Sequence, residues 1–190
     1  MSQEIFMIHI LKNLDISLFY FINHNLKNSL FDFLMPIVTN VKNFYLLFFI
    51  LWLLMIFSKN YRFRIAGWTI LITIIFSDIL SSKILKHIFL RPRPFETLEN
   101  VYKLVSSAGP SLPSSHAVNS FVAATLIMLF FKKPIYTVVA YTLAVISAFS
   151  RVYVGVHYPS DVISGAIIGF FIGWIAYKIV EKIFKLEKQL

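Results

Sequence analysis

Five stretches of predominantly apolar residues dominate this sequence, and each approaches the length that a helix needs to cross a lipid bilayer. They cover approximately residues 43–58, 65–85, 116–131, 134–150 and 160–180. A soluble domain of this size cannot hide so much apolar surface, because a large part of its chain stays in contact with water. The stretches therefore predict an all-α fold, a polytopic transmembrane helix bundle with about five spans.

The composition agrees with a bilayer as the main surroundings of the chain. Of its 190 residues, 58% are hydrophobic and 14% are charged, compared with about a quarter charged in an ordinary soluble domain. The net charge of +9 could also suit a nucleic-acid-binding protein, but the basic residues gather beside the apolar stretches. We therefore expect the bilayer as partner, no nucleic acid, and a cytoplasmic location for these basic segments. They contain Lys59, Arg62 and Arg64, Lys132 and Lys133, and Lys178, Lys182, Lys185 and Lys188.

The first 40 residues differ from the stretches that follow, because polar side chains interrupt their apolar patches too often for a simple span. Apolar residues nevertheless recur there at helical spacing, which is typical of an amphipathic helix in the headgroup plane. They are Leu11, Leu14, Leu18, Phe21 and Ile22. We expect interfacial helices over 1–40 and the transmembrane bundle over 41–190, within one domain, 1–190. A sixth, imperfect span over about 16–38 is the alternative.

Three polar clusters lie in or directly beside the segments 86–115 and 151–160, which this topology places on the side opposite to the basic segments. They comprise Lys86 with Arg93 and Pro94, the run Pro113, Ser114, Ser115 and His116, and the group Ser150, Arg151, His157 and Asp161. Guanidinium groups match phosphate oxygens through paired, directional hydrogen bonds. Lys86, Arg93 and Arg151 are therefore predicted to converge on a multiply charged anion.

Two prolines are predicted to begin helices beside this anion. Pro113 and Pro159 suit the first turn of a helix, where the missing N–H is not needed. After Pro113, the unpaired amides of Ser114, Ser115 and His116 would form a phosphate seat, to which the Ser114 hydroxyl could add. We expect the helix that begins at Pro159 to present a second N-terminus to the same anion.

The third cluster has the spacing of a nucleophile and the residue that orients it. Tyr158 precedes Pro159 and should avoid helical geometry, so we expect His157 at the mouth of the site. Asp161 can accept a hydrogen bond from one ring nitrogen of His157 and leave the other directed at phosphorus. His116 is placed to donate a proton to the leaving group.

No metal or other cofactor is expected. The sequence has no cysteine, and the clusters offer no paired carboxylates. We therefore favour positive charge from side chains over a metal bound by His116, His157 and Asp161. Arg91 and Lys83 are interpreted as basic residues that extend to the lipid headgroups.

In order and spacing, the clusters resemble the signature of the type-2 phosphatidic-acid phosphatase superfamily, KxxxxxxRP, PSGH and SRxxxxxHxxxD. The resemblance spans residues 86–161 and implies a helical membrane bundle over nearly the whole chain. It implies His157 as nucleophile, Asp161 as its partner and His116 as acid. The phosphate ligands that it implies are Lys86, Arg93, Ser114 and Arg151.

Two residues depart from what their surroundings would suggest. Ser115 stands where the family usually has glycine, so left-handed backbone geometry becomes costly there. We expect a right-handed first helical turn at Ser115, with its N–H directed at phosphate.

Asp78 lies within a predicted span, where a carboxylate is usually paired. We expect a structural role for it, with Lys83, Ser81 or Ser82 as the partner.

Together these features predict a metal-independent enzyme that hydrolyses a lipid phosphate or pyrophosphate through a phosphohistidine, at the periplasmic face of a bacterial inner membrane. The resemblance implies lipid A 1-phosphate, undecaprenyl pyrophosphate and phosphatidylglycerol phosphate as candidate substrates. A lipid-to-lipid phosphotransferase is the alternative reaction, and a non-catalytic lipid-binding or transport protein is the alternative class. Mere binding needs neither His116 nor His157. The sequence indicates no oligomeric state.

Overall fold

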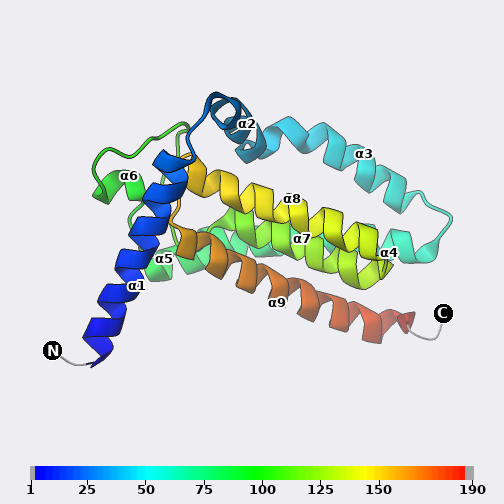
Figure 1. Ribbon diagram of the computed structural model, residues 1–190. Helices are drawn as coiled ribbons and strands as arrows, with labels where there is room; N and C mark the ends of the chain where they lie inside the picture. The colour runs from blue at the N-terminus through cyan, green and yellow to red at the C-terminus, as the bar shows by residue number, and fades with distance from the viewer. Residues whose placement is uncertain (1–2, 187–190) are drawn as a thin grey trace.

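The computed structural model describes residues 3–186, and its long helices pack side by side (Figure 1). Within these residues no strand is formed, so the predicted all-α class is confirmed. Lys188, one of the predicted cytoplasmic lysines, lies outside the described residues. The elements in chain order are α1 (Gln3–Tyr20), η1 (Phe21–Asn25), α2 (Ser29–Thr39), η2 (Val41–Phe44), α3 (Tyr45–Ile56), α4 (Tyr61–Ile79), η3 (Leu80–Leu85), α5 (Lys86–Phe89), α6 (Pro94–Thr97), α7 (Ser115–Phe131), α8 (Pro134–Tyr153) and α9 (Pro159–Phe184).

Several of these helices can cross a bilayer, which confirms an integral membrane helix bundle. The helix that begins with α4, together with α8 and α9, is long and apolar enough to do so. The α2 helix and the segment η2–α3 qualify only as a pair bent by 72°, and α7 is apolar but has 17 residues. The count of five spans therefore stays a prediction. The sixth span over residues 16–38 is not formed, because η1 separates α1 from α2 there.

The two ends of the bundle differ in chemistry. The α3–α4 turn, the α7–α8 turn and the end of α9 lie together at one end (Figure 1). There the ring of Phe63 contacts that of Phe131, and the ring of Tyr61 contacts that of Phe184. The basic segments thus share one end, as the topology predicted. The segments that hold the three polar clusters lie at the other end.

The N-terminal helix α1 crosses the bundle at the end that carries the polar clusters (Figure 1). Of the predicted apolar stripe, Leu11, Leu14 and Leu18 on α1 and Phe21 at the start of η1 keep between 49% and 61% of their surface exposed, whereas Ile22 packs against the core. The opposite side of α1 contacts the protein through residues such as Phe19, which is fully buried. This arrangement suits a helix at the membrane surface, although its place in the headgroup plane stays a prediction.

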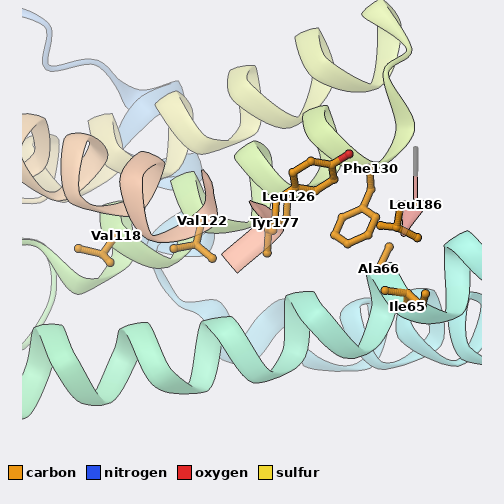
Figure 2. Packing of buried hydrophobic residues seen from close by; sticks show 8 residues of the cluster. All are labelled: Ile65, Ala66, Val118, Val122, Leu126, Phe130, Tyr177 and Leu186. Carbon is orange, nitrogen blue, oxygen red and sulfur yellow. The ribbon is translucent and has the colours of Figure 1, made fainter. Parts of the chain in front are cut away.

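One face of α7 forms the core between α4, α7 and α9 (Figure 2). Val118, Val122, Leu126 and Phe130 recur every four residues and are fully buried, as helical periodicity requires for a single inward face. The ring of Phe130 packs edge-on against Tyr177 of α9, with the ring centroids 5.1 Å apart. The central position of α7 determines where its first residue and the neighbouring His side chain lie.

Three glycines allow α9 to approach α7 closely. Gly165, Gly169 and Gly173 recur every four residues and face α7. A Cβ on Gly165 would lie 2.8 Å from the carbonyl oxygen of Ser114, and one on Gly169 would collide with the carbonyl oxygen of Val118. Small residues at such spacing are common where membrane helices meet. The close packing brings the start of α7 against the first turns of α9.

We expect Gly169→Ala to destabilise the protein more than Gly173→Ala. A methyl group at residue 169 would collide with the Val118 carbonyl oxygen, whereas one at residue 173 would lie 3.0 Å from the Cβ of Thr125 and 3.1 Å from the carbonyl oxygen of Val122, contacts that a small shift of the helices relieves. Overpacking costs about 1–3 kcal/mol, so Tm in detergent should fall by several degrees for the first variant and less for the second. Equal Tm values would contradict a backbone contact at Gly169.

Candidate active site

His157 lies in a turn between α8 and α9 and not within a helix. Gly155 forms this turn with a φ of +80°, and a Cβ there would lie 2.7 Å from the carbonyl oxygen of Tyr102. Only glycine suits such a position. Tyr158 is extended, with φ −76° and ψ 156°, and α9 begins at Pro159 as predicted. The turn buries His157, which keeps 1% of its surface exposed.

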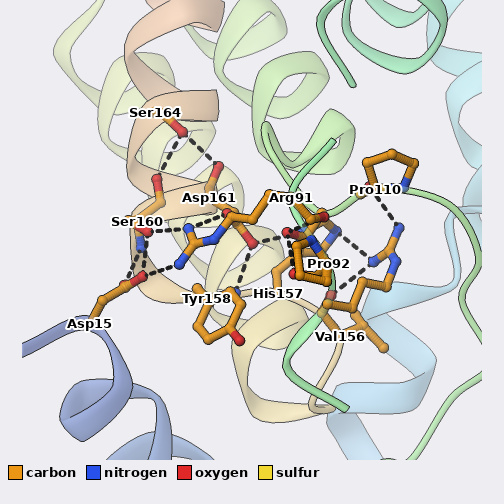
Figure 3. Close-up of polar contacts among 12 residues, drawn as sticks. Asp15, Arg91, Pro92, Pro110, Val156, His157, Tyr158, Ser160, Asp161 and Ser164 are labelled. Carbon is orange, nitrogen blue, oxygen red and sulfur yellow. Dashed lines mark hydrogen bonds and ion pairs between the residues drawn. The ribbon is translucent and has the colours of Figure 1, made fainter. Parts of the chain in front are cut away.

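The imidazole of His157 lies between a carboxylate and a guanidinium (Figure 3). Its Nδ1 lies 3.4 Å from Oδ2 of Asp161, at ion-pair distance but without the alignment of a hydrogen bond. Its Nε2 lies 3.3 Å from Nη1 of Arg93. A guanidinium can only donate, so Nε2 accepts, and the proton of the neutral ring lies on Nδ1, towards Asp161.

The surroundings of His157 keep its imidazole neutral. Burial lowers the pKa of His157 well below its usual value, and the charges of Arg151, Arg93 and Lys86 lower this pKa further. Both causes act in the same direction, because each disfavours a positive charge on the ring. A neutral ring with a lone pair on Nε2 is the nucleophilic form of histidine.

Arg93 is fixed beside His157 by backbone carbonyl groups. Its guanidinium donates from Nε to Gly109 at 2.8 Å, from Nη1 to Val156 at 2.8 Å and from Nη2 to Ala108 at 3.1 Å. The side chain keeps 2% of its surface exposed. The loop between α6 and α7 and the turn after α8 therefore hold this cation in place without a carboxylate partner.

Lys86 begins α5 directly after η3, a π-helical segment whose wider turn sets the face on which the lysine lies. Its ammonium group lies near enough to Arg93, Arg151 and Asp161 for their charges to act on it. Within the described residues 3–186 the Lys86 side chain has no hydrogen-bond partner. In the same part of the chain, no group of three or more His, Cys, Asp or Glu side chains could hold a metal ion.

Thr39, the last residue of α2, contacts two of the predicted site residues. Its hydroxyl accepts a hydrogen bond from Nη1 of Arg151 at 2.6 Å, and its carbonyl oxygen lies 3.1 Å from Nε2 of His116. A carbonyl only accepts, so Nε2 of His116 carries a proton. Sequence reasoning missed Thr39, and no local signal could have found it, since 112 residues separate it from Arg151.

The start of α7 differs in two respects from the prediction. Pro113 is not in the first helical turn, because Ser114 is the extended N-cap and the helix begins at Ser115. The right-handed turn at Ser115 is thereby confirmed. The predicted unpaired amide of Ser114 is wrong, since it donates to the carbonyl oxygen of Asp161 at 3.0 Å. The amides of Ser115 and His116 have no partner within residues 3–186.

The interpretation of Arg91 as a headgroup contact is wrong. Its Nη1 donates to Oδ1 of Asp161 at 2.7 Å and to the hydroxyl of Ser160 at 2.6 Å, and its Nη2 pairs with Oδ2 of Asp15 at 2.7 Å (Figure 3). Sequence reasoning preferred Arg93 because only Arg93 has the motif spacing to Lys86. Arg91 turns inward because two carboxylates are buried beside it.

The N-terminus of α9 does not face a substrate anion, contrary to the prediction. Asp15 accepts hydrogen bonds from the amide of Ser160 at 2.8 Å and from its hydroxyl. The second carboxylate, that of Asp161, accepts a hydrogen bond from the amide of Tyr158 at 2.9 Å. The positive end of this helix dipole is therefore already paired with carboxylates of the protein itself.

Asp78 has a different partner from the predicted ones. Its carboxylate accepts a hydrogen bond from Nδ2 of Asn119 on α7 at 2.9 Å. The hydroxyl groups of Ser81 and Ser82 donate instead to the backbone carbonyl of Asp78. The prediction that Lys83, Ser81 or Ser82 pairs with the carboxylate is wrong, because the packing of α4 against α7 supplies a closer donor.

Residues 65–185 match the family model described as the PAP2 superfamily. This match covers more than half of the chain and includes all three polar clusters. The chain belongs to the PAP2 superfamily. The resemblance inferred from the motifs is thereby confirmed.

Known PAP2 proteins match most of the chain. Lipid A 4'-phosphatase of Bacteroides thetaiotaomicron is 30% identical over an alignment of 192 positions, gaps included, which covers 93% of this chain and 81% of that protein. Undecaprenyl-diphosphatase of Sulfolobus acidocaldarius is 31% identical, over 93% of this chain and 84% of that protein. The crystal structure of Aquifex aeolicus LpxE superposes with a TM-score of 0.74 at 31% identity, and the match covers 87% of this chain and 95% of that one.

We expect the buried His157 to make this PAP2 protein less stable as the pH falls below about 6.5, the usual pKa of histidine. Below that pH the imidazole of the unfolded chain takes up a proton, whereas the lowered pKa of His157 keeps the folded ring neutral. Because the unfolded state then binds more protons, stability falls by up to about 2 kcal/mol between pH 7 and 5. In His157→Gln, Tm should fall less over this range than in the wild type. Equal decreases would contradict a neutral, buried ring.

Proposed function

We propose that this chain hydrolyses the phosphate or pyrophosphate group of a membrane lipid through a phosphohistidine formed on Nε2 of His157. The observation that carries the proposal is the placement of the His157 imidazole, whose Nε2 lies 3.3 Å from Nη1 of Arg93 while its Nδ1 lies 3.4 Å from Oδ2 of Asp161. The proposed nucleophile thus has an orienting carboxylate near one ring nitrogen and an anion-binding cation near the other.

The same end of the bundle offers groups that can bind the phosphoryl oxygens. Lys86, Arg93 and Arg151 supply positive charge, and Nε of Arg151 is buried without a partner within residues 3–186. The hydroxyl groups of Ser114 and Ser115 are likewise buried and unpaired there. A buried polar group without a partner costs about 1–3 kcal/mol. A bound phosphate would satisfy these groups and receive the positive charge it needs.

Two displacement steps account for the chemistry. Nε2 of His157 attacks phosphorus as the bond to the leaving oxygen breaks, and His116 donates a proton to that oxygen. Nε2 of His116 keeps its proton in the hydrogen bond to Thr39, so the acid is the doubly protonated imidazolium, which the negative charge of the bound lipid phosphate favours, and the transferred proton is the one on Nδ1. Water then attacks the phosphohistidine, His116 takes up the water proton, and inorganic phosphate leaves with His157 restored. Asp161 stabilises the positive charge that the phosphorylated ring carries.

A lipid substrate follows from the surroundings of the site. The site lies at one end of an apolar bundle, beside α1, whose leucines are exposed. By the positive-inside rule the basic end is cytoplasmic, so the site would face the periplasm from the inner membrane. The relatives named lipid A 4'-phosphatase and undecaprenyl-diphosphatase support lipid A phosphates and undecaprenyl pyrophosphate as candidates, and phosphatidylglycerol phosphate remains a third.

We expect detergent-solubilised protein to release inorganic phosphate from one or more of these lipids with a chelator present. His157→Gln should reduce release to the uncatalysed rate, and His116→Gln should slow it by about 10²–10⁴-fold, the usual contribution of a general acid. Phosphate release, lipid product and trapped phosphoenzyme would be measured together. Full activity in His157→Gln would refute the nucleophile, and loss of activity with chelator would indicate a metal. Release only in the presence of a lipid acceptor would indicate a phosphotransferase.

We expect Thr39→Val to lower kcat/KM about tenfold or more, because it removes the hydroxyl that accepts from Arg151 at 2.6 Å. A hydrogen bond to a charged group contributes about 1.5–3 kcal/mol, and about 1.4 kcal/mol corresponds to a tenfold change in rate. Thr39→Ser should keep most of the activity. Thr125→Val is the matched control, since its hydroxyl bonds Tyr141 within the bundle. Equal kcat/KM in Thr39→Val and the control would contradict this role.

A further inference from the structure

Asp15 is a buried carboxylate on α1, a helix whose other contacts with the protein are made mainly by apolar side chains and by the hydroxyl of Tyr20, which donates to the carbonyl oxygen of Glu99. It keeps 8% of its surface exposed. Its Oδ2 pairs with Nη2 of Arg91 at 2.7 Å, and its Oδ1 accepts the amide of Ser160 at 2.8 Å (Figure 3). None of the three motifs contains this residue and no step of the proposed mechanism involves it, although it connects α1 to the first turn of α9.

Arg91 is held on both sides by this arrangement. Nη2 faces Asp15, whereas Nη1 faces Oδ1 of Asp161, at 2.7 Å each. The ring of Tyr158 lies against the guanidinium, 4.0 Å from its carbon atom to the ring centroid. A planar guanidinium with two fixed edges has little freedom to rotate, so the position of Asp15 determines that of Arg91.

Arg91 in turn fixes the rotation of the Asp161 carboxylate. Because Oδ1 is bound to Arg91, the other oxygen, Oδ2, is directed at the amide of Tyr158, 2.9 Å away, and at Nδ1 of His157, 3.4 Å away. Without the partner on its far side, Arg91 could shift towards both oxygens of Asp161. Such a bidentate pair would draw Oδ2 away from the imidazole.

The charges lead to the same expectation. Arg91 alone would cancel the charge of Asp161 as felt by His157. With Asp15 the group contains two carboxylates and one guanidinium, so a net negative charge remains behind the imidazole. Phosphorylation of Nε2 places positive charge on that ring, and a buried negative charge nearby stabilises it.

We propose that Asp15 is a positioning residue for phosphoryl transfer, which acts through Arg91 to orient Asp161 and to keep its charge available to His157. This inference rests on the proposed phosphohistidine chemistry. Asp15 has no contact with the groups that would bind phosphate, so its loss should affect the chemical step and leave substrate binding unchanged.

The decisive variant is Asp15→Asn, which is isosteric. The asparagine Oδ1 can still accept the amide of Ser160, so the backbone cap of α9 is retained, while the amide NH2 group that replaces Oδ2 can no longer accept from Arg91 or from the Ser160 hydroxyl. Asp32→Asn is the matched control, because Asp32 lies on α2 and accepts hydrogen bonds from Tyr153 and Tyr102 but has no bond to Arg91 or Asp161. Thermal unfolding of both variants measures any purely structural effect.

We expect Asp15→Asn to lower kcat about tenfold, a size typical of coupled neighbours, with KM within a factor of two or so of the wild type. Asp32→Asn should leave kcat unchanged. In an Arg91→Gln background, which should itself lower kcat, Asp15→Asn should have no further effect. Unchanged kcat in Asp15→Asn, or an undiminished effect in the Arg91→Gln background, would overturn the inference.

Orthovanadate, an analogue of five-coordinate phosphorus, gives a second measurement that needs no lipid. Asp15→Asn should weaken vanadate binding about tenfold and leave the binding of inorganic phosphate unchanged, as measured by calorimetry in detergent. If wild-type protein releases no phosphate from any lipid, the proposed function fails while the vanadate comparison still decides the role of Asp15. Equal vanadate affinity in variant and wild type would overturn that role, and absence of vanadate binding to the wild type would overturn both.

Discussion

The structure depends on three cations held close together at one end of an apolar bundle. Lys86, Arg93 and Arg151 repel one another, and burial makes that repulsion stronger than it would be in water. The protein supports Arg93 and Arg151 with neutral acceptors, namely backbone carbonyl groups and the hydroxyl of Thr39. Since no carboxylate among residues 3–186 forms an ion pair with them, their charge stays available to an anion and also disfavours a positive charge on His157.

The close packing of α7 on α9 determines the relative positions of the residues at this site. Gly165 and Gly169 let the two helices approach until the amide of Ser114 donates to the carbonyl oxygen of Asp161. The second motif and the third motif are thereby joined through backbone atoms, whose positions do not depend on side-chain rotamers. A small separation of the helices would therefore move the start of α7, including His116, away from the imidazole of His157.

The residues proposed to act on the substrate could be predicted from the sequence, whereas Asp15 and Arg91, which lie on the other side of Asp161 from His157, could not. Motif spacing and helical periodicity gave His116, His157 and Arg93 as candidates, which the structure places at one end of the bundle, and predicted the start of α9 at Pro159, because these features depend on neighbours within a few turns; α9 ends at Phe184, four residues beyond the expected end. The partners of Arg91 lie 76 and 70 residues away, and no periodicity reports such contacts. Pro113 was misplaced for a local reason: a proline can stand either inside a helix or just before its N-cap, and only the contact of Ser114 with α9 decides between them.

The N-terminal segment contributes more than attachment to the membrane surface. Thr39 contacts His116 and Arg151, and Asp15 forms an ion pair with Arg91. Both lie outside residues 65–185, the part of the chain that matches the PAP2 family model. The matched part thus contains the three motifs, but the hydrogen-bond partners that orient His116 and Arg151 come from elsewhere. A site assembled in this way requires α1 and α2 to be docked on the bundle before its geometry is complete.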